Sequence, residues 1–269
     1  MALKETANTV LRMIETGSYE VDGQTVQIEI EQTTAVKGTR LYAPEELASF
    51  GAAIGPSPAI RVVDGTTQTV ALEMATSVKG NVGLLNFASA RNPGGGFLNG
   101  AKAQEEDLCR CSGLYPCLLQ CMEYYEVNRG QSSLLYTDHA IFSPTVPFFK
   151  TRGTGEYLKV PFFVSVITAP APNSGPFLRN EQGSTDELKS TFLRRWKNVL
   201  RIAHDQNISH LLLGAWGCGA FGGDPVMASE TAREAIRSEG GGIIEIVFAI
   251  PGKGRQSKEN LDAFRATFR

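Results

Sequence analysis

The sequence predicts an α/β layered fold that is preceded by a helix and a β-hairpin. From about Ile60 the chain repeats short apolar strand patterns, polar loops and helical patterns, with a strand over residues 60–63, a helix over 67–78 and a strand over 82–87. The β-branched run at 164–167 indicates a further strand. Strands that alternate with helices in this way favour a sheet layered with helices.

Two periodicities predict the N-terminal elements. Apolar residues near helical spacing come before Gly17, and they are Leu3, Val10, Leu11 and Ile14. Apolar residues that alternate with polar ones then lie around Asp22-Gly23, and they are Val21, Val26, Ile28 and Ile30. Because Asp-Gly is a strong hairpin turn signal, we expect a helix followed by two paired strands.

The middle of the chain predicts one helix, more strands and a loop. The helix carries the apolar residues Leu118, Leu119, Met122 and Tyr125. Strands are expected at residues 140–143 and 148–149. The two prolines within residues 169–173 cannot continue a strand, so a long surface loop is expected up to Gly183.

Local start signals predict the last elements. Ser184 and Glu187 form a capping box for a long helix, which leads into a strand over residues 210–214. A glycine-dense loop follows that strand and ends at Pro225, a residue suited to the first turn of the next helix.

Composition and charge restrict the function. The chain has 269 residues with a formal net charge of −2, which gives no broad basic surface for nucleic-acid backbones. No apolar run is long enough to cross a bilayer, and the start of the chain lacks the apolar core of a secretory signal. We expect a cytoplasmic protein with no membrane or general nucleic-acid partner, organised as an N-terminal extension (1–55) packed on one core domain (56–269).

The cysteines do not match a familiar metal site. Four of the five are crowded into the spacing C-x-C-x5-C-x3-C, at Cys109, Cys111, Cys117 and Cys121. Small apolar side chains on a buried helix face explain this crowding, and a reducing cytosol keeps the thiols free. No histidine stands in a catalytic-cysteine signature that would make Cys218 a nucleophile. The sequence therefore predicts neither a metal nor a cofactor.

Two glycine-rich loops follow predicted strands. The first contains Gly94-Gly95-Gly96 after the strand at 82–87, and the second spans residues 214–223. Glycines let backbone N–H groups turn toward an oxyanion, and loops at the ends of parallel strands meet at one sheet edge. We expect the two loops to converge on one ligand, with a diphosphate as its anionic part. Phe221 is expected to lie over a ribose or another flat surface of that ligand.

A pair of carboxylates follows the first glycine loop. Glu105 and Glu106 would repel a phosphate that lay against them, so the ligand's anionic part and its reactive sugar should lie several ångströms apart. Neighbouring residues on a helix project about 100° apart, so both side chains cannot meet one reacting oxygen equally. One carboxylate is expected to be the catalytic group and the other to orient the ligand.

These motifs resemble the bacterial-type poly(ADP-ribose) glycohydrolases, whose fold is the macro domain with an N-terminal extension. The family signature is a Gly-Gly-Gly loop followed after a short spacer by Gln-Glu-Glu, met here by Gly94 to Gly96 and Gln104 to Glu106. The resemblance covers essentially the whole chain, including residues 85–90, 112–115, 169–173 and 214–222. It implies a three-layer α/β/α arrangement around a mixed sheet.

The resemblance also implies the reaction and the roles of residues. The reaction is hydrolysis of the ribose–ribose O-glycosidic bond of poly(ADP-ribose), mainly from chain ends, without a metal. Glu106 matches the catalytic acid, protonated at the start, and Glu105 would hold ribose hydroxyls. The residues implied to bind ADP-ribose are Asn86, Gly94, Gly95, Gly96, Asn99, Gln104, Gly217, Cys218, Gly219, Ala220, Phe221 and Gly222.

One position departs from the family, and two alternatives remain. The family's second loop often ends in Gly-Asn before Asp-Pro, whereas this chain has Gly222-Gly223, which removes a side chain near the phosphates. A non-catalytic ADP-ribose-binding macro domain would share the phosphate loops. A hydrolase that removes single ADP-ribose groups would share them too, with ADP-ribosylated proteins as its substrates. Free ADP-ribose is the expected product of hydrolysis.

Overall fold

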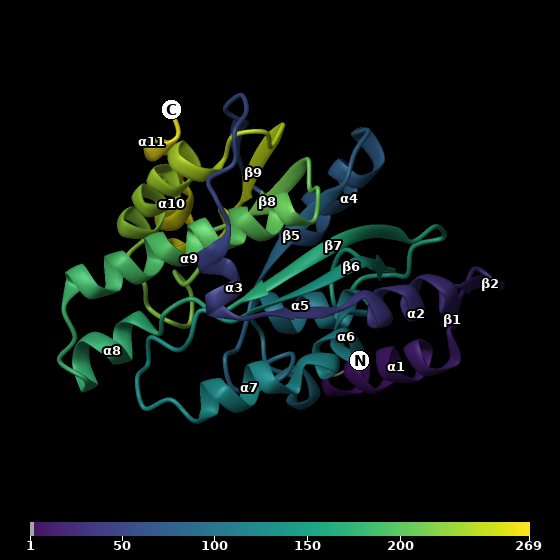
Figure 1. Ribbon diagram of the computed structural model, residues 1–269. Helices are drawn as coiled ribbons and strands as arrows, with labels where there is room; N and C mark the ends of the chain where they lie inside the picture. Colours follow the sequence, from purple (N-terminus) through teal and green to yellow (C-terminus); the bar gives the residue numbers. More distant parts are fainter. Residues whose placement is uncertain (1–2) are drawn as a thin grey trace.

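A mixed sheet forms the centre of the protein, for which a computed structural model describes residues 3–269 (Figure 1). Across those residues the sheet has seven strands in the order β3-β6-β7-β5-β8-β9-β4. Its strands are β3 (Arg40–Tyr42), β4 (Ala59–Val63), β5 (Val82–Phe87), β6 (Ala140–Phe148), β7 (Phe162–Ala169), β8 (His210–Leu213) and β9 (Glu245–Ala249). From β7 to β4 each neighbouring pair is parallel, while β6 is antiparallel to both β7 and β3. The carboxyl ends of the five parallel strands therefore lie at the same edge of the sheet.

Helices cover both faces of this sheet. One face carries α1 (Leu3–Thr16), α2 (Glu29–Gly38), α4 (Thr67–Ser77), α5 (Gln104–Cys111), α6 (Leu114–Leu118) and α7 (Met122–Arg129). The other carries α3 (Pro44–Ser49), α8 (Ser174–Asn180), α9 (Thr185–Asp205), α10 (Pro225–Glu239) and α11 (Arg255–Thr267). Neighbouring strand residues alternate between the two cores, as Leu84 and Leu85 do. The predicted three-layer α/β/α fold with a mixed sheet is confirmed.

The N-terminal helix and hairpin are present, but the second strand is shorter than predicted. The hairpin pairs β1 (Ser18–Val21) with β2 (Gln24–Gln27). Asp22 and Gly23 both have positive φ, 50° and 73°, as a tight two-residue hairpin turn requires. Ile30 was wrongly predicted to lie in a strand.

Ile30 lies in α2 and is 78% exposed. The apolar alternation ends at buried Ile28, where the chain turns into the helix. Glu29 and Glu31 occupy the first turn of α2, where carboxylates interact favourably with the helix dipole. The local start of this helix thus overrides the period-two pattern.

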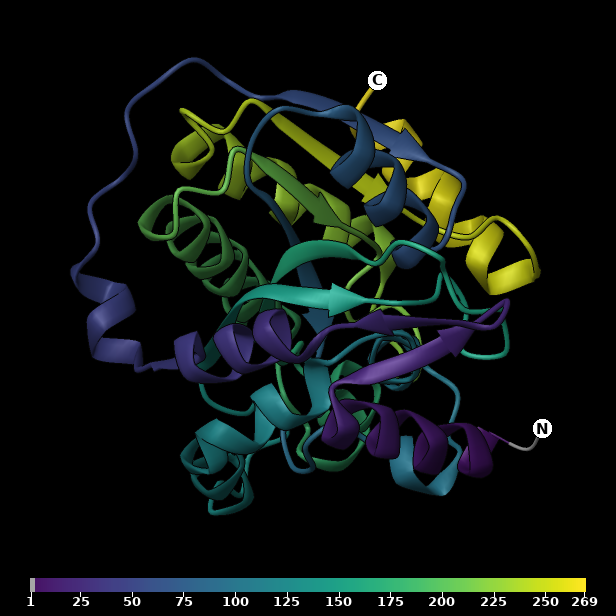
Figure 2. The same cartoon turned by 90° about the vertical axis from the view of Figure 1, so that its right-hand side faces the viewer.

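The first 55 residues also contribute a strand to the main sheet. β3 pairs with β6 at one edge, and β4 forms the opposite edge. The chain between α3 and β4 runs around the outside of the molecule from one edge to the other (Figure 2). The division into residues 1–55 and 56–269 stays a prediction.

Three further elements differ from the sequence prediction. The helix expected around residues 118–125 is divided into α6, the 3-10 helix η2 (Leu119–Cys121) and α7, because the backbone at Cys121 leaves the helical region (φ −119°, ψ 53°). The strands expected at 140–143 and 148–149 are one strand, β6, with a register shift between Ser143 and Val146. The expected loop before Gly183 contains α8.

Local capping signals were predicted correctly. The Ser184 hydroxyl accepts a hydrogen bond from the Glu187 amide at 3.1 Å, and α9 follows directly. Pro225 begins α10, where the Asp224 side chain accepts from the Val226 amide at 2.9 Å. Among residues 3–269, none of the helices combines the length and apolar character that crossing a bilayer requires.

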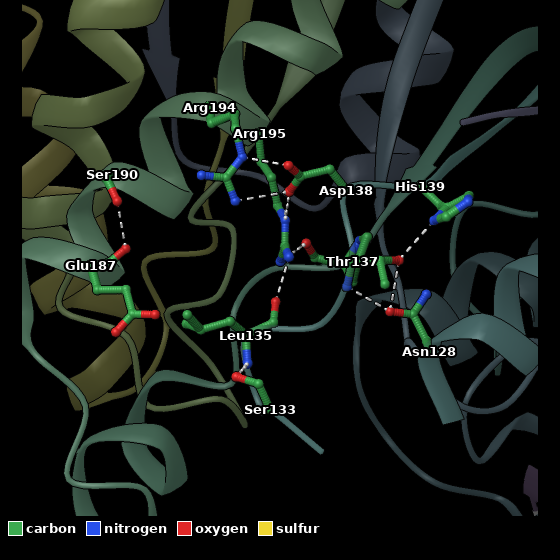
Figure 3. Close-up of polar contacts among 11 residues, drawn as sticks. Asn128, Ser133, Leu135, Thr137, Asp138, His139, Glu187, Ser190, Arg194 and Arg195 are labelled. Atoms are coloured by element: carbon green, nitrogen blue, oxygen red, sulfur yellow. Dashed lines mark hydrogen bonds and ion pairs between the residues drawn. The ribbon is translucent and has the colours of Figure 1, made fainter. Parts of the chain in front are cut away.

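A buried arginine connects α9 to two loops at the sheet edge (Figure 3). Arg195, 2% exposed, donates from Nε to Asp138 Oδ1 at 2.9 Å and from Nη1 to the Pro170 carbonyl at 3.0 Å, and a third bond goes to the Leu135 carbonyl. Burial opposes ionisation of Asp138, but Arg194 and Arg195 outweigh it and lower the pKa of that carboxyl. The ion pair with Asp138 fixes the Arg195 side chain, which in turn holds the segment after β7 through the Pro170 carbonyl.

Replacing Asp138 with asparagine should destabilise the fold by about 3 kcal/mol, because it leaves the buried Arg195 guanidinium without its counterion. Urea unfolding at neutral pH measures this loss. Asp22→Asn is the matched control, since the Asp22–Lys159 pair is exposed and should contribute little. Equal urea midpoints for the two variants would contradict a structural role for the buried pair.

Candidate active site

A cavity of about 1190 Å³ lies at the edge where the parallel strands end. Its walls come from the loops after β5, β8 and β9 and from the N-terminus of α4. The segment after β7 contributes Ala171 to the wall. Ligands of open α/β sheets bind at such an edge, because the loops there can vary while the strands hold them rigidly. The two glycine-rich loops do converge, since β5 and β8 are neighbouring parallel strands.

The first glycine loop is a series of tight turns. Gly94 and Gly95 have φ angles of 65° and 58°, which disfavour any other residue type. The Gly95 amide donates to the Asn92 carbonyl at 2.9 Å, and the Phe97 amide donates to the Gly94 carbonyl at 3.0 Å. The loop thus uses part of its own backbone to fix its shape.

Both predicted carboxylates lie against this loop. Glu105 and Glu106, in the first turn of α5, are 2% and 8% exposed. A methyl group placed on Gly95 would stand 2.4 Å from Glu106 Oε1 and 3.1 Å from Glu105 Oε2. The two carboxyl groups therefore meet beside one glycine.

Glu106 is held by one oxygen only. Its Oε1 accepts a hydrogen bond from the Gly96 amide at 2.8 Å. Its Oε2 is buried and has no hydrogen-bond partner among residues 3–269. An unpartnered buried polar atom is costly in a folded protein and is common where a ligand completes the site.

Glu105 is held by both oxygens. Oε1 accepts from Asn86 Nδ2 at 3.0 Å, and Oε2 accepts from the Ser89 amide at 2.8 Å. Burial raises the pKa of Glu105 to about 8, against these two donors, and the neighbouring Glu106 raises it further. Glu105 is thus fixed in position by the end of β5.

Gln104 connects α5 to the same strand. Its Nε2 donates to the Leu85 carbonyl at 2.8 Å, and its Oε1 accepts from the Phe87 amide at 2.9 Å. Both ends of the amide are therefore occupied by backbone groups, although the residue also lines the cavity. These two hydrogen bonds hold the first turn of α5 against the end of β5.

The second glycine loop presents amides that have no internal partner. Within residues 3–269, the amides of Gly217, Gly219, Ala220 and Phe221 donate no hydrogen bond to the protein. In the first loop, by contrast, the Gly95 and Gly96 amides are already bound to Asn92 and Glu106. The second loop is therefore the better anion site, while the first loop positions a carboxyl group.

Neighbouring elements support the second loop from both sides. Gln256 Nε2 and Asn260 Nδ2 of α11 donate to the Cys218 carbonyl at 2.9 and 3.4 Å. The Phe221 ring is half-buried, and its centroid lies 6.3 Å from that of Tyr136. The loop is thus held in place by distant residues.

Most predicted site residues line the cavity. Those that do are Gly95, Gly96, Asn99, Gln104, Glu105, Glu106, Gly217, Gly219, Ala220 and Phe221. The remaining ones lie behind its wall or beside it, and they are Asn86, Gly94, Cys218 and Gly222. Asn86 is fully buried beneath Glu105. Cavity residues that the sequence did not single out include Gln68, Arg110, Thr154, Ser257 and Asn260, which carry no local motif.

At Gly223, where the family often has asparagine, a side chain would point into the loop itself. A methyl group at this position would stand 2.8 Å from the Gly217 carbonyl oxygen and 3.4 Å from Ser174 Oγ. The loop has therefore closed over the space that a side chain would need.

The crowded cysteines are core residues. Cys109, Cys111, Cys117 and Cys121 are all buried in the hydrophobic core beneath α5 to α7, as small apolar side chains would be. Burial raises the pKa of the Cys117 and Cys121 thiols to about 11 in each case. These thiols are not poised as nucleophiles.

The raised pKa of Glu105 predicts a pH-dependent stability. The folded protein keeps this proton up to about pH 8, whereas the unfolded chain loses it near 4.5, so stability falls between those values as pH rises. Glu105→Gln, which cannot ionise, should gain relative to the parent by up to about 1.4 kcal/mol per pH unit across that window. Urea unfolding at several pH values measures the difference, with exposed Glu126→Gln as control. A difference in unfolding free energy between Glu105→Gln and the parent that stays constant with pH would contradict the prediction.

Comparisons with known proteins agree with this geometry. The model of the family "Microbial-type PARG, catalytic domain" matches residues 7–151. A poly(ADP-ribose) glycohydrolase from Thermomonospora curvata, bound to the inhibitor ADP-HPD, is 35% identical over 99% of both chains, with a TM-score of 0.89. One from Deinococcus radiodurans, in complex with ADP-ribose, is 38% identical over 93% of this chain and 98% of its own, with a TM-score of 0.79. No curated protein matches significantly. The chain belongs to the microbial-type poly(ADP-ribose) glycohydrolase (PARG) family.

Proposed function

We propose that this protein hydrolyses the ribose–ribose O-glycosidic bond of poly(ADP-ribose), mainly at chain ends, and releases ADP-ribose. The observation that carries this proposal is the meeting of two buried carboxyl groups beside Gly95, next to a loop with unpartnered amides. The similar Thermomonospora and Deinococcus enzymes, with bound inhibitor and bound ADP-ribose respectively, support the choice of substrate.

The second loop binds the diphosphate of the terminal ADP-ribose unit. Amides of Gly217, Gly219 and Ala220 supply donors without a charged side chain, and Phe221 supplies a flat apolar surface for the nucleoside. The hydrogen bond from Arg195 to the Pro170 carbonyl holds the neighbouring segment, which includes Ala171, against the cavity.

Glu106 acts as general acid. Because the Gly96 amide engages Oε1, Oε2, which has no partner among residues 3–269, is the oxygen left to face the glycosidic bond. Proton transfer to the departing ribose oxygen breaks the glycosidic bond and leaves an oxocarbenium-like sugar, which the nearby diphosphate stabilises. The resulting Glu106 carboxylate then takes a proton from the attacking water, and the acid is restored.

Glu105 orients the sugar. Its oxygens each hold one protein donor, yet a carboxyl group has further lone pairs that can accept ribose hydroxyls. A purely binding macro domain would gain nothing from burying two carboxyl groups beside an anionic ligand, since their desolvation and repulsion oppose binding. This cost favours a hydrolase.

We also propose a cytoplasmic location. All five cysteines are free thiols, as a reducing compartment maintains.

Glu106→Gln should retain ADP-ribose binding within about threefold while kcat falls by roughly 10²–10⁴, the usual contribution of a general acid. Chromatography of ADP-ribose released from purified poly(ADP-ribose) measures the rate, and calorimetry measures binding. The exposed Glu126→Gln serves as control. Unchanged turnover in Glu106→Gln would reject this residue as the acid.

Gly95→Ala should lower kcat by about a hundredfold, because the new methyl group displaces the Glu106 carboxyl from its place. Gly23→Ala is the matched control: Gly23 also has positive φ, 73°, but a methyl group there meets nothing within 4 Å. Both variants carry the same kind of backbone strain, so a larger loss of thermal stability in Gly95→Ala measures the contact of the new methyl group with the carboxyl groups. Equal activity in the two variants would remove Gly95 from the site.

A further inference from the structure

Tyr136 adopts a backbone conformation that aromatic residues rarely take. Its φ angle is 62°, in the left-handed region, where the Cβ atom crowds the backbone. Among residues 3–269 it is the only aromatic residue with a positive φ. Strain of this kind persists only where the surrounding structure imposes it, and it is concentrated at functional sites.

Hydrogen bonds fix the chain immediately before and after Tyr136. On one side, the Leu135 carbonyl accepts a hydrogen bond from Arg195. On the other side, the Thr137 amide donates to Asn128 Oδ1 at 2.8 Å (Figure 3). The conformation of Tyr136 is therefore imposed by its neighbours, which are held from α9 and from α7.

The side chain of Tyr136 packs against Phe221 of the second glycine loop. The two ring centroids lie 6.3 Å apart and the ring planes are tilted by 47°, within the range of favourable aromatic pairs. Phe221 lines the cavity, whereas the partly buried Tyr136 lies outside the residues that line it. Tyr136 therefore acts on a bound ligand only through Phe221.

The start of α8 connects the same two segments. The Asn173 amide donates to the Leu134 carbonyl at 3.0 Å, and the Gly175 amide donates to the Phe221 carbonyl at 2.8 Å. Asn173 Nδ2 also donates to the Tyr136 hydroxyl, at 3.5 Å, which makes this a long and weak hydrogen bond. The backbone of Phe221 is thus held by α8, while Tyr136 supplies an aromatic contact to its ring.

We propose that Tyr136 is a positioning residue that holds the Phe221 ring in the orientation in which it packs on the nucleoside of the bound ADP-ribose unit. This inference rests on the proposed function, in which Phe221 supplies an apolar surface of the binding site. A ring that is restrained before the ligand arrives loses less conformational entropy on binding, so the contact raises affinity. The strained backbone at position 136 is the cost of placing its ring against Phe221.

A double-mutant cycle between Tyr136 and Phe221 tests this role. Tyr136→Asn removes the ring and introduces a residue that tolerates positive φ. Affinity for ADP-ribose, measured by calorimetry, should fall by about fivefold, the size expected of an aromatic pair. In the Phe221→Ala background the same change should alter affinity by less than about 1.5-fold, because the ring through which Tyr136 acts is absent.

Tyr136→Phe is the matched control. It keeps both the ring and the strained backbone and loses only the weak hydrogen bond from Asn173, so its affinity should stay within about twofold of the parent. Thermal unfolding reports whether each variant keeps the fold. Tyr136→Leu, which retains an apolar side chain without a flat ring, repeats the cycle if Tyr136→Asn does not fold.

Two results would overturn the proposal. Equal losses of affinity in the parent and Phe221→Ala backgrounds would show that Tyr136 acts independently of Phe221. An unchanged affinity in Phe221→Ala itself would show that the ring to be positioned does not contact the ligand. If the unmodified protein released no ADP-ribose from polymer, the proposed hydrolase function would fail instead, and the cycle on ADP-ribose binding would still decide the role of Tyr136.

Discussion

The active site depends on the contact between the first turn of α5 and the glycine loop after β5. Gly95 brings its backbone to the Glu106 carboxyl at a distance that a Cβ atom would prevent, and the Gly96 amide fixes one oxygen of that carboxyl group. The same approach brings Glu105 alongside. Positive φ angles at Gly94 and Gly95 are the conformational requirement for this arrangement. Glycine at these positions therefore serves the carboxyl groups as much as any phosphate.

The sheet makes this contact possible by collecting distant segments at one edge. Five parallel strands end there, so segments as far apart in sequence as Thr66 and Asn260 enclose one cavity. Buried polar side chains then connect the loops to the helices: Gln104 holds α5 to β5, Arg195 holds the segment after β7, and α11 holds the second loop. The two faces of the sheet contribute different parts of the site, with carboxyl groups from one and unpartnered amides from the other.

Features set by local chemistry could be predicted from the sequence. The Asp22-Gly23 turn, the Ser184 N-cap and the helix start at Pro225 each depend on neighbouring residues, and each is present. The signature of three glycines and Gln-Glu-Glu likewise placed the carboxyl groups in the cavity wall. Ile30 was misplaced because an alternating apolar pattern competed with acidic residues that begin a helix.

Features set by tertiary contacts had no local signal. The partner of the Gly96 amide depends on how α5 docks, and the role of Arg195 depends on Pro170 and Leu135, which lie 25 and 60 positions away in sequence. The closure of the second loop around Gly223 is also a consequence of packing. The most direct test of the central claim is a crystal structure of the protein with ADP-ribose. We expect Glu106 Oε2 to lie about 3 Å from the anomeric oxygen of the bound ribose, with the diphosphate on the amides of Gly217, Gly219, Ala220 and Phe221. A ribose turned away from Glu106 would exclude this residue as the acid.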